Sequence, residues 1–164
     1  MVGAGEVGSY VAALLSREGN DVVVVDERRD PLRRIEQDND VLTVVGDATN
    51  PSTLLEAEVD KAEVLVAVTE SYKTNLLVCL QVRQARGEEP LSTIARIDDP
   101  ELRGPAGRKI RDAMGVDLVL DPDEQTAGAI QELLLYRGAR NLYEMAGGEV
   151  LLVGARLTED APIV

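Results

Sequence analysis

Short apolar runs alternate with helix-like segments along most of the chain, and no other feature restricts the fold as strongly. The runs are continuous enough for strands that are covered on both faces. Such alternation builds parallel sheets from strand–helix–strand units, so the sequence predicts an α/β fold with a doubly wound, Rossmann-like parallel sheet. The predicted strands are Asp21–Val25, Val41–Val45, Glu63–Val68, Ser92–Ile97 and Val116–Leu120, and the predicted helices are Val7–Glu18, Pro31–Asp38, Ser52–Ala57, Thr74–Arg86 and Gly107–Met114.

The beginning of the chain does not fit this pattern. Only Met1 and Val2 precede the first glycine, whereas a doubly wound sheet needs a central first strand of about five residues. We expect the printed sequence to lack the start of this strand, in which case the chain should be less stable than a longer parent.

The last part of the chain has a different pattern. A helix is predicted from Glu124 to Leu135, after Asp121–Pro122. Two strand-like stretches follow, Asn141–Met145 and Glu149–Leu157, and Gly147–Gly148 between them is typical of a hairpin turn.

The charge balance excludes several classes of partner. The chain has 17 basic and 30 acidic residues, which gives a net charge of −13. Such a surface repels phosphate backbones and anionic lipids, so we expect no nucleic-acid binding. The composition resembles that of proteins from salt-loving cells, where salt screens the self-repulsion of the acidic chain. An ordinary acidic protein from a GC-rich genome is the alternative.

Missing residue types exclude most hydrolase chemistry. The sequence contains no histidine, so the usual histidine-containing zinc sites and Ser-His triads are absent. The single cysteine, Cys79, lies in an apolar predicted helix and is interpreted as a buried small side chain. No run approaches the roughly 18 apolar residues of a membrane span, and no leader is evident, so we expect a soluble, cytoplasmic protein.

The strongest motif is Gly3-Ala4-Gly5-Glu6-Val7-Gly8, which has the spacing GxGxxG. Gly3 permits a tight turn, Gly5 lets a pyrophosphate approach the backbone, and Gly8 lets helix and strand pack closely. The N-terminus of the following helix then faces the phosphates. A glycine turn with only a structural role is the alternative.

An acidic residue follows at the distance that this motif requires. The strand after the glycine loop ends in Asp26, eighteen residues after Gly8. A carboxylate there accepts hydrogen bonds from the ribose hydroxyls and repels a 2′-phosphate, which favours NAD over NADP. Arg28 and Arg29 could accommodate such a phosphate, but they are better interpreted as the solvated start of a helix.

Further polar residues follow the other predicted strands. Asp47, Thr69 and Arg96 stand at strand ends, where open α/β sheets bind their ligands. We expect Asp47 and Ala48 to flank an adenine, Thr69 to contact the ligand, and Arg96 to face a phosphate. The alternatives are helix caps for Asp47 and Thr69 and an ion pair for Arg96. The acidic group Asp121–Glu124 is interpreted as solvated surface, so no metal site is predicted. A cation site formed by Asp121, Asp123 and Glu124 is the alternative.

Taken in order, these segments resemble the TrkA-type RCK (KTN) domain, the regulatory domain of potassium uptake systems and some potassium channels. The resemblance extends from Val2 to about Leu135, and the tail resembles the start of the small C-terminal subdomain. It implies a nucleotide-binding domain at 1–135 and a linker with the start of that subdomain at 136–164. The residues that carry it are GAGEVG with Asp26, Gly46-Asp47-Ala48-Thr49, Val66-Ala67-Val68-Thr69 with Asn75, Ala95-Arg96-Ile97, and Gly115-Val116-Asp117 with Asp121-Pro122.

The resemblance implies a regulator rather than an enzyme. In that family, nucleotide occupancy changes the geometry of a ring of domains, and the ring gates a membrane potassium-translocating subunit. It implies a homo-oligomer, either a dimer or an octameric ring, at the inner face of the membrane. The cofactor-binding residues that it implies are Gly3, Ala4, Gly5, Glu6 and Val7 in the phosphate loop, Asp26 for ribose, Asp47 and Ala48 beside adenine, Val68 and Thr69 as further contacts, and Arg96 for phosphate.

NAD or NADH is the expected cofactor, and ATP or ADP is less favoured. Relatives that respond to ATP tend to carry an arginine within the glycine loop, where this chain has Glu6. A carboxylate beside a triphosphate is electrostatically costly.

Two other functions are weighed against a regulator. The chain could be the cofactor domain of an NAD-dependent dehydrogenase, but it lacks histidine and no tyrosine begins a Tyr-x-x-x-Lys pair. It could also be a scaffold whose glycine loop binds nothing. Hydride turnover identifies the dehydrogenase, and a lack of stabilisation by ligand identifies the scaffold.

Overall fold

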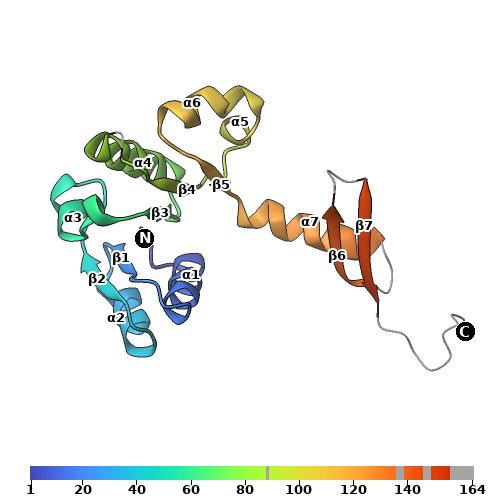
Figure 1. Cartoon of the computed structure of the whole chain (residues 1–164), viewed down its shortest axis with the longest axis horizontal. Helices are drawn as coiled ribbons and strands as arrows, with labels where there is room; N and C mark the ends of the chain where they lie inside the picture. Colours follow the sequence, from blue (N-terminus) through green and yellow to red (C-terminus); the bar gives the residue numbers. More distant parts are fainter. Residues whose placement is uncertain (88, 136–138, 146–148, 156–164) are drawn as a thin grey trace, which may run out of the picture. The chain divides into compact units, whose positions relative to one another are not determined.

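The computed structural model describes residues 1–87, 89–135, 139–145 and 149–155 (Figure 1). The described residues form two compact units, which divide between Leu120 and Asp121. The first unit contains α1 (Glu6–Arg17), β1 (Val23–Asp26), α2 (Arg29–Asp38), β2 (Leu42–Val45), α3 (Pro51–Glu56), the 3₁₀ helix η1 (Val59–Lys61), β3 (Val64–Ala67), α4 (Tyr72–Arg86), β4 (Ser92–Arg96), α5 (Pro100–Arg103), the 3₁₀ helix η2 (Pro105–Gly107), α6 (Arg108–Ala113) and β5 (Leu118–Leu120).

All strands of the first unit are parallel. β1 pairs with β2. In the second group, β4 pairs with β3 on one side and with β5 on the other. Val2 joins the two groups, because it forms parallel bridges with Val25 of β1 and with Ala67 just at the end of β3. The sheet order is therefore β2-β1-Val2-β3-β4-β5, with the first strand reduced to the residues around Val2. This arrangement confirms the predicted doubly wound α/β fold.

Helices cover both faces of this sheet because successive residues of a strand point to opposite faces. Val24 of β1 packs in a cluster with Ala12 of α1 and Leu32 of α2. Its neighbour Val25 belongs to the other cluster, which includes Val78 of α4. Side chains of valine, leucine, isoleucine and alanine fill these clusters, as the near absence of aromatic residues requires.

The predicted elements are confirmed, with ends that shift by a few residues. α4 begins at Tyr72 rather than at Thr74 because the Ser71 hydroxyl caps the helix, accepting a hydrogen bond from the Thr74 N–H at 3.2 Å. The sequence prediction missed α5, η1 and η2. These single turns are too short for a periodic pattern, although Asp99 caps α5 by accepting hydrogen bonds from the Glu101 and Leu102 N–H groups.

The second unit contains a helix and a hairpin. α7 spans Pro122–Leu135, and β6 (Ala139–Met145) pairs antiparallel with β7 (Val150–Ala155). The predicted strand pair is thus confirmed, while Gly147–Gly148 and the end of the second stretch at Leu157 lie outside the described residues. The structure divides at Leu120, before α7; the boundary at residue 135 stays a prediction.

Candidate functional site

The glycine loop lies between the bridge at Val2 and the start of α1. Gly3 has φ of +99°, and a Cβ there would lie 2.9 Å from the Thr69 nitrogen. At Gly8, a Cβ would overlap the carbonyl oxygen of Gly3. No heavy atom lies within 4 Å of the Cβ position at Gly5, so this glycine faces open space. Two glycines therefore serve packing, and the middle one leaves room for a ligand.

The loop presents the N-terminus of α1. The helix begins at Glu6, and no side chain caps it at Gly5. The first N–H groups of a helix have no intrahelical acceptor, and the helix dipole adds a partial positive charge there. The Ser9 hydroxyl steadies the turn by donating to the Ala4 carbonyl at 3.0 Å. A phosphate group fits this arrangement.

Asp26 ends β1 and is joined to the glycine loop. Its Oδ2 accepts a hydrogen bond from the Ala4 N–H at 2.7 Å, and its Oδ1 accepts one from the Arg28 N–H at 2.8 Å. The side chain is 9% exposed, and the Arg28 Nε lies 3.4 Å from Oδ1. A carboxylate has about four lone-pair sites, so acceptor capacity remains for a hydroxyl group.

Asp47 follows β2 next to Asp26, because the Gly46 N–H donates to the Asp26 carbonyl at 3.0 Å. Its Oδ1 accepts hydrogen bonds from the Thr49 hydroxyl at 2.7 Å and the Thr49 N–H at 2.8 Å. These bonds favour the charged form, so they lower the pKa of Asp47. Ala48 is buried, at 6% exposure.

An amide from α4 connects the next two strand ends. The fully buried Asn75 accepts hydrogen bonds through Oδ1 from the Thr69 hydroxyl at 2.7 Å and the Thr69 N–H at 3.0 Å. Its Nδ2 donates to the Thr69 carbonyl at 3.1 Å and to the Arg96 carbonyl at 2.9 Å. The backbone at Thr69 is thus fixed to the backbone at Arg96.

Sequence reasoning missed this role of Asn75, which entered only as part of a resemblance. A polar residue directly before the apolar sequence Leu76-Leu77-Val78 was the available signal, since a buried amide needs partners.

Arg96 ends β4 and is the cation predicted for this edge. Its Nε is buried, and among the described residues it has no hydrogen-bond partner. The sequence left open an ion pair between Arg96 and an acidic neighbour. The ion pairs found in the described part of the chain do not include Arg96.

The predicted site residues gather at the carboxyl ends of the strands. Contacts run from Gly46, which precedes Asp47, to Asp26, from Asp26 to the glycine loop, from Gly3 to Thr69, and from Thr69 through Asn75 to Arg96. Val68 belongs to the same edge, since its N–H donates to the Val2 carbonyl at 2.8 Å. In the regions that the structure describes, no cluster of three or more potential metal ligands occurs.

Comparison with protein families matches residues 1–122 to the TrkA-N domain. The chain belongs to the TrkA-N domain family. The Trk system potassium uptake protein TrkA of Vibrio alginolyticus is 34% identical over 165 residues, and that of Halomonas elongata is 32% identical over 164 residues. Each alignment covers 100% of this chain but 36% and 35%, respectively, of the relative. The chain thus spans about a third of the length of these curated relatives.

Solved structures agree with the family assignment. GsuK bound to ADP is 27% identical with a TM-score of 0.64, over 81% of this chain and 32% of that chain. A GsuK channel bound to NAD shares the fold at 19% identity, with a TM-score of 0.65 over 88% of this chain and 24% of that chain. The resemblance to RCK domains is confirmed. No helix within the described residues is long and apolar enough to span a bilayer.

Proposed function

We propose that this TrkA-N chain is the nucleotide-binding part of a cytosolic regulatory subunit of a potassium transport system, and that its ligand is NAD or NADH. The hydrogen bond from the Ala4 N–H to the Asp26 carboxylate carries the proposal. It ties the glycine loop to the position where Rossmann sheets hold the adenosine ribose, so phosphate and ribose recognition form one unit.

Each residue at this edge then has a role in binding. The backbone of the glycine loop and the first turn of α1 bind the pyrophosphate, and Asp26 accepts hydrogen bonds from the ribose hydroxyls. Asp47 and Ala48 flank the adenine, Val68 and Thr69 add contacts, and the Arg96 guanidinium faces a phosphate. The unpartnered Nε of Arg96 supports this last role, because a buried donor gains most from an anionic acceptor.

Two carboxylates set the preference among nucleotides. Asp26 would repel the 2′-phosphate of NADP. Glu6 is exposed in the first turn of α1, where its charge opposes the larger charge of a triphosphate. The dinucleotides NAD and NADH are therefore favoured over ATP. The bound NAD and ADP in the two GsuK structures support an adenine nucleotide at this edge.

Regulation follows from differential affinity. A nucleotide shifts an assembly between two geometries only if it binds them unequally. We propose a homo-oligomer, either a dimer or an octameric ring, that gates a potassium-translocating partner at the inner face of the membrane. The names of the curated relatives support a potassium uptake system. Binding occurs without hydride turnover, since the chain offers neither a histidine nor a Tyr-x-x-x-Lys pair as an acid or base.

Titration calorimetry with NAD, NADH, ADP and ATP in molar potassium chloride tests the proposal. The salt screens the net charge of −13. Binding of NAD or NADH with higher affinity than ATP, and with the nucleotide recovered unchanged, is the expected result. Silence from all four ligands contradicts the site, while oxidation or reduction of a hydroxy or keto acid by the full-length protein identifies a dehydrogenase.

Asp26→Ala should weaken NAD and NADH by about 1–3 kcal/mol, which is the scale of charge-assisted hydrogen bonds to ribose. Asp38→Ala serves as the matched control, because Asp38 is an exposed carboxylate at the far end of α2. It removes the same charge without touching the site. Equal affinities for the two variants would refute the ribose assignment.

A further inference from the structure

A second amide of α4 reaches the segment that follows β2. The Nε2 of Gln81 donates a hydrogen bond to the Thr49 carbonyl at 2.9 Å, although 32 residues separate the two in the sequence. Gln81 is half-buried, and its neighbours Val78 and Val82 are fully buried on the same helix. The bond is therefore a tertiary contact between α4 and the turn that joins β2 to α3.

This turn holds the carboxylate of Asp47. Its Oδ1 accepts hydrogen bonds from the Thr49 hydroxyl at 2.7 Å and from the Thr49 N–H at 2.8 Å. The Asp47 carbonyl accepts from the Asn50 N–H at 3.0 Å, which closes the turn. Ala48, between them, belongs to the same buried cluster as Val78 of α4. A bond to the Thr49 carbonyl thus fixes the backbone that holds the Asp47 side chain.

The arrangement leaves one oxygen of Asp47 for a ligand. Both hydrogen bonds from Thr49 use Oδ1, and no hydrogen bond to Oδ2 occurs among the described residues. The amino group of an adenine is a donor that suits this oxygen. A carboxylate binds such a group best when its direction is set in advance, because a mobile side chain loses entropy on binding.

The chemistry of Gln81 also points to a role in positioning. Its Oε1 is buried and has no hydrogen-bond partner among the described residues. A buried acceptor without a partner destabilises a fold, and an apolar side chain of the same shape would avoid that cost. Packing alone therefore favours a residue such as methionine at this position. The donor of the glutamine, which fixes the Thr49 carbonyl, explains the choice.

The bond from Gln81 complements those of Asn75 on the same helix. Asn75 joins Thr69 to Arg96, on the side of the edge where a phosphate is proposed to lie. Gln81 bonds to the segment after β2, on the side proposed for the adenine. One helix thus holds the backbone at both ends of the candidate site.

We propose that Gln81 is a positioning residue for the adenine half of the nucleotide, because its hydrogen bond to Thr49 holds the turn that directs the Asp47 carboxylate. Gln81 itself does not touch the ligand. The inference rests on the proposed function, since Asp47 contacts an adenine only if a nucleotide binds at this edge.

Gln81→Met tests this role, because methionine keeps the length and shape of the side chain but lacks the donor. Gln84→Met is the matched control, since Gln84 is exposed on the same helix. Both changes are also made in an Asp47→Ala background, and titration calorimetry measures the Kd of NADH and of AMP for each protein. Amide hydrogen exchange of the Thr49 N–H is followed without nucleotide.

Gln81→Met should raise the Kd of NADH and that of AMP by the same factor, about fivefold or more. In the Asp47→Ala background, the same change should alter either Kd by less than about twofold, because the residue through which Gln81 acts is absent. Exchange of the Thr49 N–H should be about tenfold faster, since its bond to Asp47 opens more often. The midpoint of thermal unfolding should stay within about 3 °C, and Gln84→Met should change none of these values.

Each way of failing gives a different result. An unchanged Kd in Gln81→Met, an equal loss in the Asp47→Ala background, or a loss for NADH alone would overturn the role of Gln81 and leave the nucleotide site intact. Unchanged exchange at Thr49 would also overturn it, and this measurement needs no ligand. If neither NADH nor AMP bound to the unmodified protein, the proposed function would be refuted, and the role of Gln81 with it.

Discussion

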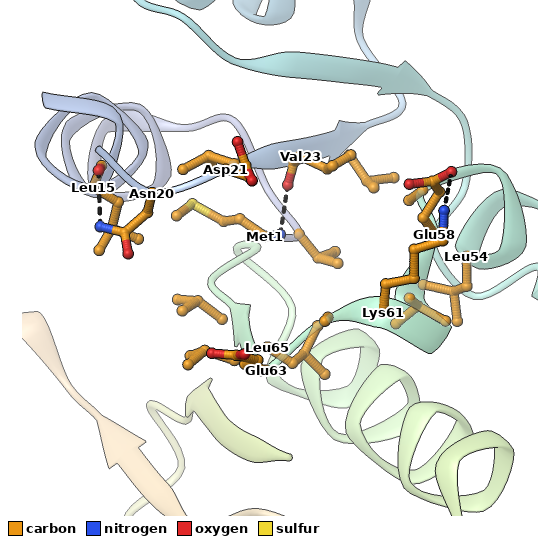
Figure 2. Close-up of a pocket in the computed structure, with 18 of the residues that line it drawn as sticks. Met1, Leu15, Asn20, Asp21, Val23, Leu54, Glu58, Lys61, Glu63 and Leu65 are labelled. Atoms are coloured by element: carbon orange, nitrogen blue, oxygen red, sulfur yellow. Dashed lines mark hydrogen bonds and ion pairs between the residues drawn. The ribbon is translucent and has the colours of Figure 1, made fainter. Parts of the chain in front are cut away.

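The two edges of the same parallel sheet differ in how their polar groups are satisfied. At the carboxyl edge, hydrogen bonds link one strand end to the next. The Gly46 N–H donates to the Asp26 carbonyl, Asp26 accepts from the glycine loop, and Asn75 joins Thr69 to Arg96. At the amino edge, where the strands begin, a cavity of about 600 Å³ lies between β1 and β3, and the buried Met1 amino group lies there as well (Figure 2). Nearby on that edge, however, Arg83 and Asp117 join α4 to the segment before β5.

This difference separates recognition from stability. At the carboxyl edge, backbone bonds fix the polar groups. Asp26 nevertheless keeps acceptor capacity, and the buried Arg96 Nε has no hydrogen-bond partner among the described residues. At the amino edge, the ion pair between Arg83 and Asp117 joins two elements of the fold. Substitutions of groups that face the ligand at the first edge should therefore change affinity, and substitutions at the second edge should change stability without changing affinity.

The largest effect is expected in the glycine loop. Two of its glycines, Gly8 and Gly5, allow stability and ligand affinity to be tested separately. Gly8→Ala should lower the free energy of unfolding by about 3 kcal/mol, since its Cβ would overlap the backbone oxygen of Gly3. Gly5→Ala is the matched change at an open position. It should leave stability within about 0.5 kcal/mol and weaken NADH, because the methyl group occupies the space where a pyrophosphate approaches.

Urea unfolding and NADH titration of both glycine variants provide the check. Destabilisation by Gly5→Ala as large as that by Gly8→Ala would show that the loop is a packing element throughout. Unchanged NADH affinity in Gly5→Ala would remove the middle glycine from the binding site.

The Met1 amino group predicts a pH effect of about 2–3 kcal/mol in a recombinant protein that begins at Met1. Its pKa is about 6 in the folded state and about 8 when exposed, so the unfolded chain binds more protons between these values. Stability should therefore rise as the pH increases from 6 to 8, and the full penalty should remain below pH 6. Urea unfolding at pH 6, 7 and 8.5 measures the effect.

This pH window is free of the usual interference. The chain has no histidine, and burial raises the pKa of Cys79 to about 12. The hydrogen bond to Glu58 raises the pKa of Lys61, which moves its titration further from this window. Acetylation of the amino group should flatten the pH profile. A profile that rises equally after acetylation would assign the titration to another group.

The sequence predicted the carboxyl edge better than the amino edge. The sequence predicted that Asp26 and the glycine loop lie at this edge, because each is read from local spacing, and the structure places them there. Their role in ligand binding stays a prediction. Asn75 was harder to assign, since its partners Thr69 and Arg96 are brought together only by the packing of α4 on the sheet. The polar residue before Leu76-Leu77-Val78 signals that an amide is buried, but it does not identify the partners of that amide.

At the amino edge, the sequence showed that only Met1 and Val2 precede the glycine loop, but it did not predict how β1 and β3 surround them. A local pattern predicts the length of a strand. The cavity and the burial of the Met1 amino group depend instead on the spacing between β1 and β3. The turn α5 was missed for a related reason, because four residues are too few for a helical period.

The smallest effect is expected at the polar cluster of the amino edge. The Asp117 carboxylate lies 2.9 Å from Arg83 Nη2 through each oxygen, and its Oδ2 also accepts from the Thr93 N–H at 2.8 Å. Burial alone would raise the pKa of Asp117, but the hydrogen bonds from Thr93 and the charge of Arg83 lower it overall.

Asp117→Ala should lower the free energy of unfolding by about 1 kcal/mol, because the ion pair is half-exposed and the Thr93 N–H loses its acceptor. NADH affinity should stay unchanged, since Asp117 lies at the opposite edge from Asp26. Asp112→Ala, which removes an exposed carboxylate from α6, is the control for charge. NADH affinity is measured under conditions where the Asp117→Ala variant is fully folded. A loss of affinity there would mean that the two edges are coupled through α4. This helix carries Asn75, which joins the strand ends at the carboxyl edge, and Arg83, which binds Asp117 at the amino edge.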